Sequence, residues 1–340
     1  MRIYASPVST LRRIGVPVAI VVAVVVFFVW EIHDKGWTLF FTLLVNGLTL
    51  GSVYALIALG YSMVYGILKL LNFAHGDVYM MGAFMGFGVL SLLGGALSPS
   101  INVWLLIGLM FAVSMLGSGG LGVVIERFAY RRLRDAPRIA PLISALGVSF
   151  LLQNSALILF GSRYRDYDTF DLVGFGGIHI GGVFIWKIRI LVVASAVALM
   201  IALTLFVART QMGKAMRATS FDREAAAMMG VNVDRVISST FFIGSALAGA
   251  AGVMFGLAFG QIFHFMGFLA GLKGFTAAVV GGIGSIPGAM VGGLLVGCVE
   301  AFSQGYANGN WSDLIVFAIL IVFMLVRPTG LLGTRAIQKV

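Results

Sequence analysis

Residues 38–66 read TLFFTLLVNGLTLGSVYALIALGYSMVYG and contain no Asp, Glu, Lys or Arg. The hydrocarbon core of a bilayer is about 30 Å thick, and an α-helix of about 20 apolar residues crosses it. This stretch exceeds one straight span and contains Asn46, Gly47, Gly51 and Gly60, which favour a tilt or a kink. Nine further stretches are also apolar enough to cross, at residues 14–30, 73–93, 102–125, 139–160, 188–208, 236–260, 267–282, 286–304 and 311–326.

The composition of the whole chain is that of a membrane protein. Hydrophobic residues make up 60% of the 340, charged residues make up 11%, and the mean hydropathy is +1.03. A soluble domain this apolar would lack the polar residues to cover its surface. Because lipid offers the backbone no hydrogen-bond partner, the spans are expected to be helices. We predict an all-α polytopic transmembrane helical bundle of about 8–10 spans, including broken or re-entrant helices.

Residues 1–37 are predicted to form a segment of their own. Three arginines precede the stretch 14–30, as at the start of a signal peptide, but no small-x-small cleavage site follows Trp30. We therefore expect a retained signal anchor and a short outer loop over residues 1–37. A single membrane domain follows over residues 38–340.

Basic residues predict the orientation of the bundle. The N-terminus carries three Lys or Arg, the loops 126–138 and 209–235 carry five each, and the C-terminus carries three. Lys and Arg concentrate in cytoplasmic loops, so all four segments and both termini are predicted to be cytoplasmic. This topology also explains the net charge of +10, so the expected partner is the lipid bilayer and not nucleic acid.

Glycines recur four residues apart in several spans, which places them on one helical face. One interpretation is tight helix packing, and the other is a smooth face along which helices slide during transport. The pairs and runs are Gly47/Gly51, Gly82/Gly86, Gly252/Gly256/Gly260, Gly284/Gly288/Gly292 and Gly293/Gly297.

Residues 281–287, GGIGSIP, interrupt the apolar run 267–304. Proline lacks a backbone donor and disfavours helix at the preceding residue, Ile286. We predict a tight turn between a short descending segment and a returning helix. Gly282, Gly284 and Pro287 then either line a transport pathway or form a turn at the inner surface.

The sequence carries no motif for catalysis or for ATP binding. The four histidines lack metal-ligand spacing, no Gly-x-Ser-x-Gly elbow occurs, and Gly213-Lys214 is followed by Ala215 where a phosphate loop has Ser or Thr. We expect neither an enzyme nor a metal or cofactor bound by this chain. If ATP drives transport, a partner subunit must supply the ATPase.

Few ionisable residues lie within or beside the spans. Most are near span ends, where long side chains reach the polar interface, and Glu126 is expected to pair locally. Asn72, His75 and Asp77 open the span at 73–93. Asp77 either lies in the first helical turn and interacts with the helix dipole, or this segment lines the pathway and gates it. The full set is Lys69, His75, Asp77, Glu126, Lys273, Glu300 and Arg327.

The loop 209–235 contains a predicted surface helix. Thr219 or Ser220 is expected to cap it, with Asp222 and Glu224 in the first turn and Gly230 as the stop. Its alanines and methionines lie beside several charges. The helix either rests on lipid headgroups or docks into the groove of a partner protein.

Glu224, Ala225, Ala226 and Gly230 form the pattern Glu-Ala-Ala-x3-Gly, which resembles the coupling motif of ABC importer permeases. Four further segments are similar to high-affinity branched-chain amino acid permeases of the LIV family, and most of all to its H type. They are NGLTLGSVYALIALGYSMVYG (46–66), NFAHGD (72–77), FTAAVVGGIGSIPGA (275–289) and RPTGLLG (327–333). The resemblance runs from residue 38 to the end of the chain, and the segment before it departs from the family pattern.

The resemblance implies a permease subunit of an ABC importer for leucine, isoleucine or valine in the bacterial plasma (inner) membrane. A second, M-type permease would complete the pathway, two ABC ATPase subunits would use ATP and Mg²⁺, and a periplasmic solute-binding protein would deliver the solute. Residues 224–230 would sit in an ATPase cleft and act as a lever in alternating access.

Two alternatives to this function stay open. Within the ABC class, urea or short amides are alternative solutes. Outside it, the chain would be a stand-alone secondary carrier or channel, and the shortage of charges within the spans counts against this.

Overall fold

The computed structural model describes residues 36–94, 102–134, 136–137, 139–167, 176–307 and 309–333. The elements are α2 (Trp37–Leu68), α3 (His75–Val89), η1 (Leu90–Gly94), α5 (Val103–Ile125), η2 (Glu126–Tyr130), η3 (Arg131–Leu133), α6 (Ile139–Phe160), β1 (Arg165–Asp166), β2 (Gly177–Ile180), β3 (Val183–Trp186), α8 (Lys187–Arg209), α9 (Gln211–Phe221), α10 (Arg223–Met228), α11 (Val233–Phe259), β4 (Gln261–Ile262), α12 (Met266–Gly281), α13 (Ile286–Tyr306), η4 (Gly309–Trp311) and α14 (Ser312–Val326).

The all-α prediction is confirmed. Every predicted span that falls within the described residues corresponds to a helix, whereas the predicted span 14–30 lies outside them. Among the described residues, eight helices are long and apolar enough to cross a membrane. The exception among the predicted spans is α12, whose 16 residues rise only about 24 Å and so fall short of the hydrocarbon core.

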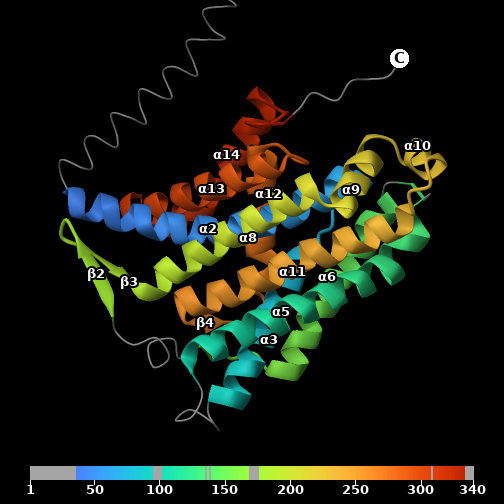
Figure 1. Cartoon of the computed structure of the whole chain (residues 1–340). Coiled ribbons are helices and arrows are strands. Elements are labelled where there is room, and N and C mark those ends of the chain that lie inside the picture. The colour runs from blue at the N-terminus through green and yellow to red at the C-terminus, as the bar shows by residue number, and fades with distance from the viewer. Residues whose placement is uncertain are drawn as a thin grey trace, which may run out of the picture.

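The bundle has two distinct ends. Figure 1 shows the β2–β3 hairpin at one end and α9 and α10 at the other, and we call them the hairpin end and the α10 end. The two strands are antiparallel, with Gly177 opposite Trp186. Gly181 and Gly182 make the turn between them with φ of 56° and 86°, values that favour glycine. β1 pairs antiparallel with β4.

The described basic segments gather at the α10 end. Arg131 and Arg134 of the loop 126–138 form ion pairs with Asp234, which belongs to the loop 209–235. Arg223 of the same loop hydrogen-bonds to the Ile67 carbonyl at the end of α2. The segment 330–333 packs against Gly282, just after α12. These described segments therefore lie together, as the charge pattern predicts.

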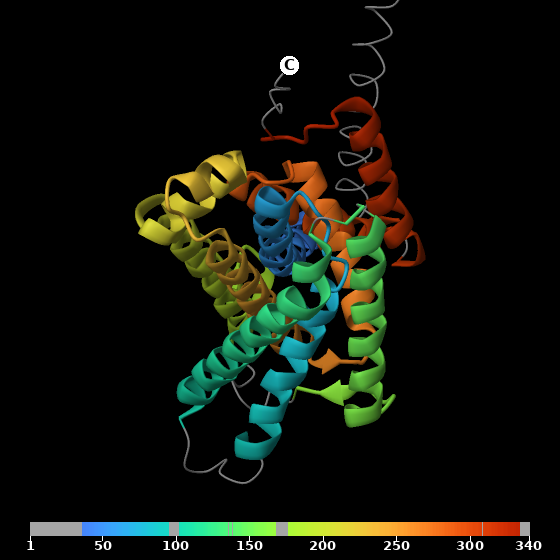
Figure 2. The same cartoon turned by 90° about the vertical axis from the view of Figure 1, so that its right-hand side faces the viewer.

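Helix α2 is the centre of the bundle. Figure 2, seen from the α10 end, shows α2 (blue) surrounded by the other helices, with α6 (green) and α14 (dark red) at the periphery. The described apolar window of α2 is 78% buried, against 11% for α14. All 32 residues of α2 are helical, so the stretch 38–66 is not broken at Asn46 or at its glycines. Packing on all sides overrides their weak helix propensity.

Glycines allow α2 and α13 to touch backbone to backbone. A Cβ added to Gly297 would lie 2.2 Å from the Gly51 Cα, and one added to Gly293 would lie 2.3 Å from the Ala55 Cα. Neither position has room for a methyl group. The packing interpretation of the four-residue glycine spacing is therefore confirmed for these helices, and the sliding interpretation stays a prediction.

Candidate functional site

The predicted surface helix of the loop 209–235 is divided into α9 and α10. Thr210 caps α9 by accepting a hydrogen bond from the Gly213 N–H at 3.0 Å, and α9 then continues to Phe221. Thr219 and Ser220 are thus inside a helix, so their predicted capping role is wrong. Asp222 is the cap of α10, because its extended backbone ends α9 and its carboxylate accepts from the next free N–H groups.

α10 presents polar and apolar side chains together. Glu224 is exposed, and Met228 and Met229 are 82% and 84% exposed, whereas Ala226 is buried against the rest of the chain. Gly230 ends the segment with φ of 83°, as its predicted role requires. The two methionines and Glu224 form an unpartnered apolar and acidic tip at the α10 end.

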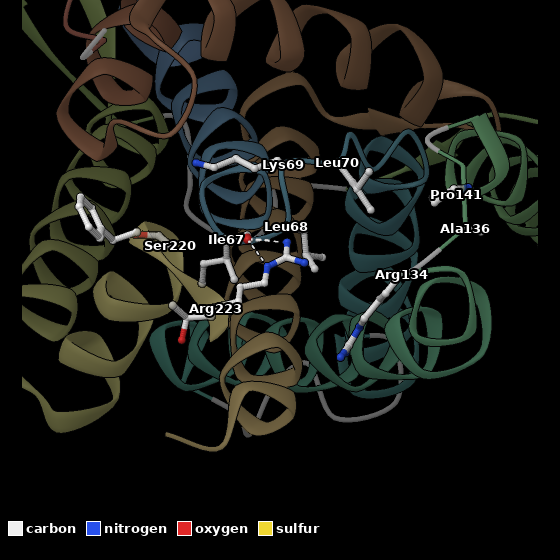
Figure 3. Close-up of a pocket in the computed structure, with 11 residues that line it drawn as sticks. Ile67, Leu68, Lys69, Leu70, Arg134, Ala136, Pro141, Ser220 and Arg223 are labelled. Carbon is white, nitrogen blue, oxygen red and sulfur yellow. Dashed lines mark hydrogen bonds between the residues drawn. The ribbon is translucent and has the colours of Figure 1, made fainter. Parts of the chain in front are cut away.

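Arg223 connects this tip to the central helix. Figure 3 shows its guanidinium directed at the end of α2, where Nε and Nη2 donate to the Ile67 carbonyl at 3.1 and 2.7 Å. That carbonyl lies in the last turn of α2, where helical carbonyls lack an intrahelical donor. Arg223 therefore joins the start of α10 to the end of α2.

A cavity of about 440 Å³ lies beside this connection (Figure 3). Its walls come from the end of α2, the segment around Ala136 and Pro141, and the junction of α9 with α10. Lys69, Arg134 and Arg223 make its lining basic. Partial burial and the charge of Arg223 lower the pKa of Lys69. The cavity is a basic recess between the α9–α10 junction and the end of α2.

Asn72, His75 and Asp77 are all buried where α3 begins. Asn72 accepts a hydrogen bond from the Tyr130 hydroxyl at 3.1 Å, and the His75 ring lies 4.8 Å from the Tyr61 ring, centroid to centroid. These groups join α2, α3 and the turn η2 in the interior of the bundle.

The position of Asp77 fits the first of its two predicted roles, and the gating role stays a prediction. It lies in the first turn of α3, where the helix dipole favours a carboxylate. It also accepts hydrogen bonds from Ser149 and Gln153 of α6, the latter at 3.1 Å. No cation of the described residues pairs with it. The sequence did not reveal the two α6 partners, because α6 is apolar on most of its length.

The turn after α12 is at the α10 end of the bundle. Gly282 and Gly284 have φ of 113° and 89°, and a Cβ on Gly284 would lie 3.7 Å from the Gly66 Cα in the last turn of α2. Ile286 is helical, contrary to the prediction, because Pro287 lies in the first turn of α13, where no intrahelical donor is needed. Gly76, the neighbour of Asp77, packs against Gly267 and Gly271 near the start of α12. The turn and Asp77 therefore lie near opposite ends of α12.

The sequence reasoning missed a cluster of three buried residues and the half-exposed Asp313, which we call the Lys273 cluster (Tyr54, Lys273, Glu300 and Asp313). The Lys273 Nζ lies 2.7 Å from Glu300 Oε1 and 2.6 Å from Asp313 Oδ1, and the Tyr54 hydroxyl donates to Glu300 Oε2 at 2.9 Å. Most ionisable residues near span ends were expected to reach the polar interface. Lys273 and Glu300 do not, because they face each other inside the bundle.

A second cluster, the Glu126 cluster (Glu126, Arg131, Arg134, Asp234 and Ser238), lies at the α10 end. Arg134 bridges Glu126 and Asp234, and the Ser238 hydroxyl donates to Glu126 at 2.8 Å. The predicted local pairing of Glu126 is confirmed. Among the described residues, no group of three or more His, Cys, Asp or Glu side chains is placed to hold a metal ion.

Comparison with known proteins identifies relatives over most of the chain. The family model for the permease component of branched-chain amino acid transport systems matches residues 43–324. The chain is 46% identical to the high-affinity branched-chain amino acid transport system permease protein BraD of Pseudomonas aeruginosa, over 87% of this chain and 97% of that protein. It is 44% identical to LivH of Escherichia coli, over 87% and 96%. It is 26% identical to LivM of Salmonella typhimurium, over 84% and 68%.

Proposed function

The chain belongs to the family of branched-chain amino acid transport permeases, and from this premise we propose that it is the H-type permease subunit of an ATP-driven ABC importer for leucine, isoleucine and valine. The observation that carries the proposal is the identity of 44–46% with LivH and BraD over nearly their whole length. The chain is a multi-pass membrane protein, and its role in the complex is to form part of the translocation pathway.

The proposed complex contains several other subunits. The weaker similarity to LivM supports a second, M-type permease that shares the fold and completes the pathway. Two ABC ATPase subunits hydrolyse ATP with Mg²⁺, and a periplasmic binding protein delivers the solute. The gathering of basic segments at the α10 end supports a cytoplasmic location for that end, with both termini, in the bacterial inner membrane.

Coupling in this proposal occurs at α10. Glu224, Ala225, Ala226 and Gly230 form the part that docks into an ATPase, and the exposed methionines beside Glu224 supply apolar contact area. Nucleotide-driven closure of the ATPase pair moves α10, and Arg223 passes the movement to α2 through the Ile67 carbonyl. Because α2 packs against α13 without spare room, the helices re-pack between discrete arrangements rather than deform continuously.

Two groups of residues are proposed to gate the pathway. Asn72, His75 and Asp77 form the buried group at the start of α3. Gly282, Gly284 and Pro287 form the turn beside Gly66 at the end of α2, so movement of α2 is expected to shift that turn. The pathway opens alternately to either side as these groups shift.

The coupling proposal is tested in proteoliposomes that contain the assembled transporter. Glu224→Ala is expected to lower ATP-driven leucine uptake about tenfold, the loss typical of a central interface residue. Gly230→Val forces a branched side chain into a left-handed conformation, whereas Gly230→Asn tolerates it, so only the valine variant is expected to lose uptake. Lys214→Ala, on the exposed surface of α9, is the control.

Association with the ATPase is measured separately by co-purification. Arg223→Lys is expected to keep association but reduce uptake, because a lysine cannot make both hydrogen bonds to Ile67. Normal uptake in both Glu224→Ala and Gly230→Val would refute the lever. Uptake of leucine by the purified chain without ATPase subunits would favour the stand-alone carrier, and uptake of urea or short amides in preference to leucine would favour the other solute class.

A further inference from the structure

A small polar cavity opens between four helices toward the hairpin end. We call it the Arg189 pocket. Its volume is about 70 Å³. Thr49, Leu50 and Ala301 are buried at its floor, and the residues at its rim are partly or fully exposed. The lining residues are Asn46, Thr49 and Leu50 of α2, Arg189 of α8, Phe259 of α11, and Ala301 and Gln304 of α13.

Arg189 gives this pocket a positive charge with no matching anion. Its Nη1 donates to the Asn46 side-chain oxygen, and no carboxylate of the described residues forms an ion pair with it. The nearby Glu300 already accepts from Lys273 and Tyr54. A partly buried guanidinium has five N–H donors, and leaving it unpaired costs free energy that an anion can offset.

The remaining groups of the pocket add hydrogen-bond donors and apolar surface. The Asn46 amide nitrogen has no partner among the described residues, and Gln304 makes only a long contact of 3.3 Å with Glu300. Leu50, Phe259 and Ala301 form apolar walls. The pocket thus combines a planar cation, amide donors and an aliphatic surface, which are the groups that recognise an apolar amino acid at its carboxylate end.

We propose that the Arg189 pocket binds the α-carboxylate of the transported amino acid on the hairpin-end side of the pathway. The cavity has room for about two water molecules at ~30 Å³ each. This space suits a carboxylate group, and the rest of the solute would extend out of the pocket. The inference rests on the proposed function, because it takes the transported solute as the ligand. It favours amino acids over urea and neutral amides, which carry no negative charge for Arg189.

The test uses alkylation of a single cysteine in the assembled permease–ATPase complex, in nanodiscs of phosphatidylcholine and without the binding protein. Cys298, the single cysteine of the chain, is replaced by serine, and Phe259→Cys places a reporter on the pocket wall without removing a polar group. Leucine is expected to slow alkylation of this cysteine. Leucinamide, which has the same side chain and ammonium but no carboxylate, is expected to need an about tenfold higher concentration or more for the same effect.

Arg189→Gln in the same background is expected to raise the leucine concentration that halves the alkylation rate by about tenfold or more. Lys187→Gln is the matched control, because Lys187 is exposed in the same turn of α8 and lies outside the pocket. Equal protection by leucine and leucinamide, or unchanged protection in Arg189→Gln, would refute the proposal.

A lipid headgroup with a net negative charge is the other source of a suitable anion, and the bilayer composition distinguishes it. Phosphatidylglycerol in place of phosphatidylcholine would slow alkylation if the pocket binds an anionic headgroup. If phosphatidylglycerol slowed alkylation and leucine had no effect on it, the pocket would be a headgroup site and the proposal would be overturned. Leucine uptake by the wild-type complex with its binding protein is measured in parallel. Uptake without protection refutes the pocket alone, whereas absence of uptake of any branched-chain amino acid refutes the proposed function.

Discussion

The Glu126 cluster and the Lys273 cluster use the same chemistry in different surroundings. In the Glu126 cluster, the side chains of Arg131 and Asp234 are 43% and 47% exposed at the α10 end. In the Lys273 cluster, the side chains of Lys273 and Glu300 are 9% and 5% exposed between α12 and α13. Solvent screens the charges of Arg131 and Asp234, whereas protein surrounds those of Lys273 and Glu300.

The two clusters also differ in charge balance. Two arginines face two carboxylates in the Glu126 cluster, whereas Lys273 alone faces both Glu300 and Asp313. The excess negative charge lies on Asp313, which is half-exposed and in the first turn of α14, where the helix dipole stabilises it. The difference teaches that one member of the exposed pair, Arg131 or Asp234, is replaceable singly, whereas the buried pair of Lys273 and Glu300 tolerates only matched changes.

Removing the buried cation is expected to have the largest effect. Lys273→Met removes the cation that pairs with the buried Glu300, so the free energy of unfolding is expected to fall by about 3–5 kcal/mol. Unfolding of the purified protein in detergent, followed by helical circular dichroism, measures it. The double variant Lys273→Met with Glu300→Gln removes both charges and is expected to recover more than half of the loss. A single variant as stable as the wild type would contradict the comparison.

Separating the helices that hold the buried cluster is expected to have the next largest effect. A Cβ on Gly297 would lie 2.2 Å from the Gly51 Cα, so Gly297→Ala pushes α13 from α2 and stretches the hydrogen bond from Tyr54 to Glu300. The expected cost is about 1–3 kcal/mol, by the same unfolding measurement. Gly108→Ala on α5 is the control, because no atom lies within 4 Å of its added Cβ, and it is expected to be neutral or stabilising. Equal effects at both positions would show that the contact is not tight.

Sequence reasoning predicted the spans and the gathering of the basic loops because lipid imposes both directly. In lipid, a segment must form its backbone hydrogen bonds within itself, so hydropathy alone locates helices such as α2 and α11. The Lys and Arg residues alone predict which loops lie at the same end of the bundle. The glycine spacing predicted close packing for a similar reason, since only glycine admits the contact seen between Gly51 and Gly297.

The polar sites were less predictable because they depend on how helices are rotated against one another. α2 is apolar around its whole circumference, so its sequence does not indicate that Tyr54 faces Glu300 or that Asn46 faces Arg189. Lys273 and Glu300 come from different helices, and only packing brings them together. The predicted cap of α10, Thr219 or Ser220, was wrong because α9 continues to Phe221. Asp222 is the first residue with an extended backbone that can cap α10.

Removing an exposed cation is expected to have the smallest effect. Arg131→Ala breaks one pair of the Glu126 cluster, but Arg134 still pairs with Asp234, and solvent screens what remains. The free energy of unfolding is expected to fall by less than about 1 kcal/mol, and this difference is expected to vanish near ~1 M salt, where the screening length is about 3 Å. The cost of Lys273→Met is expected to persist at that salt concentration because its surroundings exclude ions. If salt reduced both costs in the same proportion, water would have to reach Glu300 as freely as it reaches Asp234, and the contrast between the two clusters would be refuted.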